Sequence, residues 1–161
     1  MSELIEIRFH GDFPEWEWAR EEIERLLRKY ARFAYRQVTY WNVEYDPNED
    51  GEAAIKVSRR YRYATLVVRP GYFATKAKER EQVIAHEVAH ALTVPILDAA
   101  ACLVEHFVPE EAKEYAMEQV VQAVEATTED LALALVQAAT SQGSLEGCPD
   151  SLSLDGKGGE A

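Results

Sequence analysis

The stretch that decides the fold is residues 82–93, which read Gln-Val-Ile-Ala-His-Glu-Val-Ala-His-Ala-Leu-Thr. Its apolar residues recur at the spacing of an amphipathic helix. His86 and His90 are four residues apart, close to one helical turn, so both imidazoles lie on one face and can reach the same metal ion. Glu87 lies about a hundred degrees further around the helix, beside that ion rather than on it. The stretch therefore predicts a helix that carries a His-Glu-x-x-His metal motif.

The residue types in this motif suit one kind of chemistry. Imidazole is a good ligand for Zn²⁺, and the position of Glu87 lets its carboxylate take a proton from a zinc-bound water. Two unpaired histidines and a glutamate are costly to bury in an apolar helix without such a role. The alternative is a helix face on which His86 and His90 are simply solvated.

The same twelve residues resemble the active-site helix of the zincin metallopeptidases. Over about residues 36–137 the chain resembles the small zincin-like proteins encoded by bacteriophages and prophages. The resemblance implies a zinc-dependent metallopeptidase that hydrolyses peptide bonds, with His86 and His90 as ligands and Glu87 as the general base. In zincins a strand runs along the cleft just before this helix, and residues 64–68 take that place here.

The third ligand separates the subclasses of zincins. Metzincins extend the motif to H-E-x-x-H-x-x-G-x-x-H, but the corresponding positions here are Thr93 and Ile96, so that subclass is excluded. Gluzincins take a glutamate from a downstream helix, which the sequence predicts from Pro109 to about Ala139. The resemblance therefore implies a gluzincin-like site.

Several glutamates on this downstream helix compete for that role. Glu125 lies at the edge of the helix's apolar stripe, and Glu118 lies slightly further toward solvent. Glu129 points further away still, and Glu114 sits in the first turns, where an acid suits the helix dipole. We expect Glu125 to be the third ligand, with Glu118 as the alternative and Glu105 next.

The remaining patterns predict an α+β fold with a small, mostly antiparallel, twisted sheet packed on C-terminal helices that carry the metal. Pro14 opens an N-terminal helix that runs to about Phe33. Pro95 is expected to end the motif helix and to start a second, short apolar helix. The predicted strands are residues 4–9, 38–45, 53–61 and 63–68.

Composition limits what the chain can be. Its 161 residues predict one domain over residues 1–140, and the Gly/Ser/Asp-rich residues 141–161 predict a disordered tail. Residues 1–80 carry 15 basic and 14 acidic side chains, whereas residues 81–161 carry 2 and 15. Such acidity argues against a nucleic-acid partner. The absence of a long apolar run and of a basic, apolar N-terminus predicts a cytoplasmic protein without a membrane partner. The resemblance to metallopeptidases implies a peptide or protein substrate, and we expect a monomer or small homo-oligomer.

The sequence leaves the roles of several other residues undecided. Asp98 could hold a ligand histidine by a hydrogen bond or cap a helix, and Tyr72 or Tyr115 could donate to an oxyanion. The basic, aromatic residues 59–63 fit a strand with one solvated face better than a nucleic-acid surface. Two rivals to a peptidase also remain: a zinc-binding regulatory or protein-interaction module without proteolytic activity, and a structural domain without metal.

Overall fold

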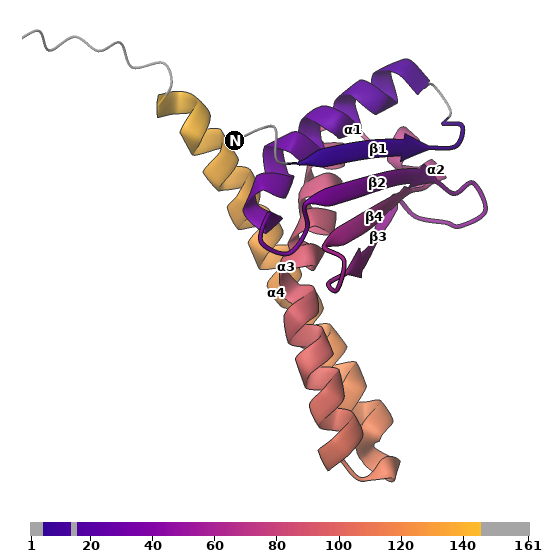
Figure 1. Cartoon of the computed structure of the whole chain (residues 1–161), viewed down its shortest axis with the longest axis vertical. Helices are drawn as coiled ribbons and strands as arrows, with labels where there is room; N and C mark the ends of the chain where they lie inside the picture. Colours follow the sequence, from indigo (N-terminus) through magenta and orange to yellow (C-terminus); the bar gives the residue numbers. More distant parts are fainter. Residues whose placement is uncertain (1–4, 14–15, 146–161) are drawn as a thin grey trace, which may run out of the picture.

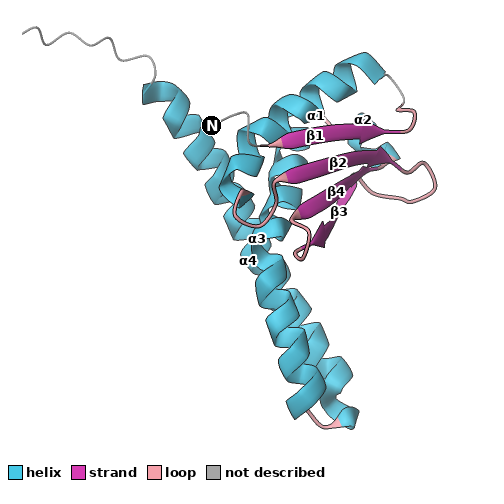
Figure 2. Ribbon diagram, viewed as in Figure 1, coloured by secondary structure: helices cyan, strands magenta, loops and turns pink. Residues whose placement is uncertain are grey.

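The computed structural model describes residues 5–13 and 16–145, and it shows an α+β arrangement of four strands and a set of helices (Figures 1 and 2). The predicted tail falls mostly outside these residues, although the last helix continues past Ala139 to Leu145. In chain order the elements are β1 (Glu6–His10), α1 (Trp16–Ala31), the 3₁₀ helix η2 (Arg32–Ala34), β2 (Tyr40–Tyr45), β3 (Ala53–Ser58), β4 (Tyr63–Val68), α2 (Pro70–Ala74), α3 (Ala77–Phe107) and α4 (Glu110–Leu145).

The sheet is mixed, so the prediction of a mostly antiparallel sheet is wrong. The strand order is β1-β2-β4-β3, with β1 parallel to β2 and β2 parallel to β4. Only β3 runs antiparallel to its neighbour, β4. The helix α1 crosses over between β1 and β2 and returns the chain to the same end of the sheet, so these two strands are parallel. Between β2 and β4 the chain reverses twice, through β3, so β4 runs parallel to β2. The tight turn after Ser58 leaves β3 as an edge strand beside β4.

One face of the sheet is covered by α1 and α3, which lie behind the strands in Figure 1. The core between these layers is built from fully buried side chains that alternate along the strands, such as Trp41 and Val43 on β2 and Leu66 on β4. From the helices it receives Leu27 and Ile84, which are also fully buried. This packing holds the middle of α3 rigidly beneath the sheet, and the motif lies on that part of α3.

The helix α3 does not end at Pro95, contrary to the prediction. Proline removes one backbone hydrogen bond and crowds the preceding turn, at a cost of about 3 kcal/mol. Residues on both sides of it, Thr93 and Val104, are buried, and α3 packs against α4. This packing offsets the cost, and a single helix of 31 residues results. Figure 1 shows that α3 and α4 form an antiparallel hairpin whose far end projects away from the sheet.

Candidate metal centre

Three predicted site residues meet between the two long helices. His86 and His90 come from the middle of α3, and Glu125 comes from the facing turn of α4. A Glu125 Oε atom lies 3.9 Å from His86 Nε2 and 3.7 Å from His90 Nε2. One ligand atom from each of the three residues lies within 4.8 Å of the other two. Within the described chain, this group is the one that could hold a metal ion.

The spacing of these atoms is wider than that of ligands around a bound zinc ion, and it is closest to it between the imidazoles and the carboxylate. Tetrahedral bonds of about 2.1 Å place two zinc ligands roughly 3.4 Å apart. The observed separations between imidazole and carboxylate exceed that value by about half an ångström or less. The Glu125 side chain is 52% exposed, whereas those of His86 and His90 are 32% and 21% exposed. The carboxylate therefore has the freedom to close on an ion that the better-packed imidazoles hold.

A buried pair of threonines fixes the register of the two helices at this site. The hydroxyls of Thr93 and Thr128 lie 2.9 Å apart, and both residues are almost fully buried. Each lies about one turn beyond a site residue, Thr93 after His90 and Thr128 after Glu125. The Thr128 hydroxyl donates to the Val124 carbonyl at 2.8 Å, so its oxygen can accept from the Thr93 hydroxyl across the helix interface. This contact between α3 and α4 also keeps Glu125 opposite the histidines.

Glu87 occupies a different environment from the other carboxylates. It is 7% exposed, and no hydrogen bond to its carboxylate is found in the described part of the chain. Burial, together with the nearby charge of Glu125, raises the pKa of the Glu87 carboxyl to about 7, and the charge of Arg69 opposes this rise. Burial also lowers the pKa of His90, with Glu125 opposing. Neutral imidazole is the form that binds a metal, so the site favours the ligating state.

A cavity of about 490 Å³ opens beside His86 and Glu87. It lies between α3, α4 and the start of the edge strand β3, where Glu52 and Ala53 form part of its wall. The sequence assigned the cleft to residues 64–68, but these form β4, which lies inside the sheet between β2 and β3. The strand beside the cavity is therefore β3, whose outer edge has no neighbouring strand among the described residues.

The sequence missed Glu129 as a residue of the site. It was expected to point away from the metal, yet it lines the cavity together with His86 and Glu87. Glu129 lies one helical turn after Glu125, a spacing that places both on the same face of α4. That spacing is the signal that could have identified it.

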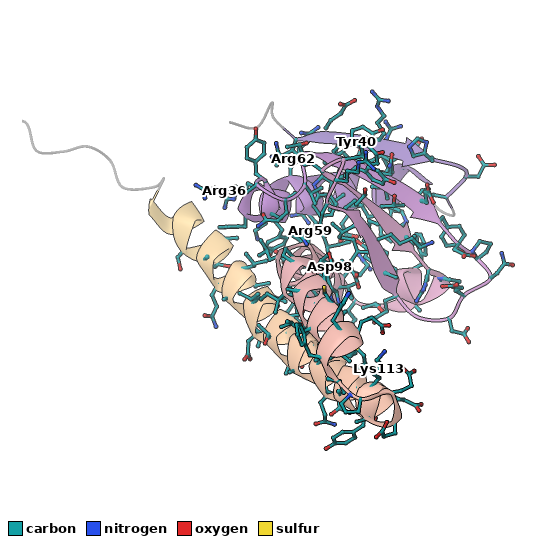
Figure 3. The ribbon with its side chains drawn as sticks, turned by 60° about the horizontal axis from the view of Figure 1, so that its bottom comes forward. Arg36, Tyr40, Arg59, Arg62, Asp98 and Lys113 are labelled. Atoms are coloured by element: carbon teal, nitrogen blue, oxygen red, sulfur yellow. The ribbon has the colours of Figure 1, made fainter. Side chains whose placement is uncertain are left out.

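The other residues that the sequence offered for the site lie away from His86, His90 and Glu125. The described cluster does not include Glu118, which is exposed on α4. Asp98 accepts a hydrogen bond from Arg59 at 3.1 Å rather than from a histidine ligand (Figure 3). Glu105 pairs with Lys113. Tyr115 is 67% exposed.

Tyr72 is also not at the site. It is fully buried against Phe73, and the Arg80 guanidinium lies over its ring. It is not among the side chains that line the cavity. No described residue is thus identified as an oxyanion donor.

Neither a protein-family model, nor a curated protein sequence, nor a solved structure matches this chain. The resemblance to the zincins therefore rests on the motif and on the pattern around it.

Proposed function

We propose that this protein is a zinc-dependent metallopeptidase of the gluzincin type. The observation that supports the proposal most is the convergence of His86, His90 and Glu125 next to a buried glutamate and an open cavity. Two imidazoles and one carboxylate are a donor set that zinc uses in catalytic sites, where a fourth position stays open. Zinc held there would polarise a peptide carbonyl and make a coordinated water acidic near neutral pH.

The chain's own residues account for the remaining steps. A substrate strand pairs with the free edge of β3, whose first residue, Ala53, forms part of the cavity wall. Glu87 accepts the proton of the attacking water as the new C–O bond forms. It then gives that proton to the amide nitrogen as the C–N bond breaks.

A peptidase assay with matched variants tests the proposal. The zinc-loaded protein is incubated with a mixture of fluorogenic peptides, beside the same protein stripped of metal and beside zinc-loaded Glu87→Gln. We expect cleavage by the wild type alone, with a loss of at least a hundredfold in Glu87→Gln, because the base is removed while the ligands remain. Zinc binding without cleavage of any peptide would favour a regulatory module over an enzyme.

A further inference from the structure

The cavity beside the candidate metal centre has an unbalanced charge. Four carboxylates line it, from Glu52, Glu79, Glu87 and Glu129, and no lysine or arginine does. Two arginines of the neighbouring segments are engaged elsewhere. Arg80 pairs with Glu22, and Arg69 pairs with Glu49.

The walls between these carboxylates are apolar. Val83 comes from α3, and Ala132, Leu133 and Val136 come from α4. The rim glutamates 52, 79 and 129 are exposed. A long side chain with a cationic end fits this combination, because its methylene stem packs on apolar walls while its head stays near water and carboxylates. The volume of about 490 Å³ is ample for one such side chain.

We propose that this cavity is a specificity pocket for a lysine or arginine side chain of the substrate, next to the bond that is cleaved. The inference rests on the proposed peptidase function, and it adds the substrate class. The pocket adjoins His86 and Glu87, so a peptide that pairs with β3 places the side chain of a residue flanking the scissile bond into it.

The first test reads cleavage specificity. Wild-type protein loaded with zinc is incubated with an equimolar peptide library, and the cleaved bonds are identified by mass spectrometry. We expect lysine and arginine to be enriched about tenfold over norleucine at one position beside the cleaved bond, since each exposed carboxylate contributes modestly. The double variant Glu79→Gln/Glu129→Gln should reduce this enrichment to about threefold or less. Glu111→Gln, an exposed glutamate at the far end of α4, is the matched control and should leave it unchanged.

A binding measurement keeps the inference testable without turnover. Zinc-loaded Glu87→Gln is titrated with two dansyl peptides that differ only in lysine or norleucine at one position. Because this variant keeps the three rim glutamates and lacks only the carboxylate of Glu87, we expect severalfold tighter binding of the lysine peptide. Equal affinities, or cleavage without a preference for cationic residues, would overturn the pocket assignment while leaving the peptidase proposal intact. Absence of any cleavage by the wild type would instead count against the peptidase proposal.

A second, independent feature is an apolar face on the projecting hairpin of α3 and α4. Along α3, Ile96, Leu103 and Phe107 are 56%, 58% and 80% exposed. Their spacing, together with Ala99, places them on one face of the helix. The helix α3 is long and apolar enough to cross a bilayer, and only 33% of its most apolar stretch is buried in the structure. This surface is larger than isolated surface hydrophobics explain.

The apolar face continues onto α4 and carries no carboxylate. The line along which α3 and α4 touch is marked by buried residues, Thr93 and Val104 on α3 and Val124 and Thr128 on α4. We call this the contact line of each helix. Successive helix residues are 100° apart around the axis. On this basis His90 and Glu125 lie to one side of the contact lines, the metal-site side. The apolar row of α3, which is Ile96, Ala99, Leu103 and Phe107, lies to the other side. A row of small residues on α4 lies on that same other side: Ala112, Ala116 and Ala123. Asp98, Glu105, Glu111, Glu114 and Glu118 lie on the metal-site side, and Glu110, the first residue of α4, lies on the contact line itself.

We propose that a second copy of this chain covers this face. A bulky row on α3 beside a small row on α4 is self-complementary, because a two-fold axis along the hairpin sets each bulky row against the partner's small row. The result is a four-helix bundle with an apolar centre. A face without carboxylates lets two chains of net charge −12 meet with the least repulsion between like charges. A bilayer fits less well, since acidic side chains flank this face and anionic lipid repels them.

Light scattering after size exclusion tests the dimer. We expect twice the chain mass at 50 μM for the wild type and the monomer mass for Leu103→Glu. Tyr115→Glu, which is 67% exposed and lies on the same face of α4 as Glu111 and Glu118, is the matched control and should stay dimeric. A monomeric wild type, or a dimer that Leu103→Glu leaves intact, would overturn the proposal. Sedimentation of a monomeric wild type with phosphatidylcholine vesicles would point to a lipid surface instead.

Discussion

The buried carboxyl of Glu87 gives the sharpest stability prediction, for protein stripped of metal. Replacing Glu87 with glutamine keeps the shape of the side chain and removes its ionisation. Glu87 is 7% exposed, and burial raises the pKa of its carboxyl from 4.5 to about 7 in the folded protein. The folded state therefore holds a proton that the unfolded state has lost between these two pH values. Stability from this group is present at low pH and falls as the pH rises through about 7.

The size of the effect follows from the two pKa values. Above pH 7 the buried carboxylate costs about 3 kcal/mol of unfolding free energy relative to a group with an ordinary pKa. Because glutamine does not ionise, the free energy of unfolding of Glu87→Gln should increase relative to that of the wild type as the pH rises. Roughly 2 kcal/mol of that gain falls between pH 5.5 and 8.5. The lowered pKa of His90 acts in both proteins, so it largely cancels in the difference.

Urea denaturation at a series of pH values, with a chelator present, measures this difference. The control is Glu118→Gln, which removes an exposed glutamate of α4 and should show no pH-dependent difference. A difference between wild type and Glu87→Gln that stays constant from pH 5.5 to 8.5 would refute the reasoning, because it would mean that Glu87 titrates with an ordinary pKa.

Three further predictions concern the helices around the site. Glu125→Ala should weaken zinc binding at least a hundredfold and so remove about 2.7 kcal/mol of zinc-linked stabilisation, whereas Glu118→Ala should change neither; isothermal titration and thermal melts with zinc measure both. Thr128→Val should lower the unfolding free energy by about 1 kcal/mol and weaken zinc binding severalfold, and unchanged zinc affinity would show that the threonine pair does not set the register. Asp98→Asn should leave zinc affinity within twofold, because Asp98 pairs with Arg59 and not with a ligand.

Local sequence patterns predicted the residues of the candidate site better than they predicted the arrangement of the strands and helices. The i, i+4 spacing of His86 and His90 is a property of a single helix, so the sequence is enough to place them on one face. Placing Glu125 needed only the phase of a second helix, which its apolar stripe provides. Its approach to His90 at 3.7 Å depends on the packing of α3 on α4, which no local pattern contains.

The features that were predicted wrongly depend on contacts between distant segments. The direction of β1 relative to β2 is set by the crossover through α1, and that of β4 relative to β2 by the reversal through β3. Residues 38–45 alternate with the period of two that belongs to a single strand, and this period does not specify the neighbouring strands. The local cost of Pro95 favours a helix end, and only burial of residues beyond it, such as Val104, reverses that preference. Glu129 was misplaced because its helix phase was judged against the apolar stripe rather than against the cavity that β3 completes.

The most direct test of the central claim is the zinc content of the protein. Protein purified without chelator is analysed by elemental mass spectrometry, and metal-stripped protein is titrated with Zn²⁺, for the wild type and for His86→Ala and His90→Ala. Two histidines and Glu125 within 4.8 Å of one another predict about one zinc per chain, lost in both variants. A wild type that neither carries zinc nor binds it on addition, or variants that bind it as tightly as the wild type, would contradict the account.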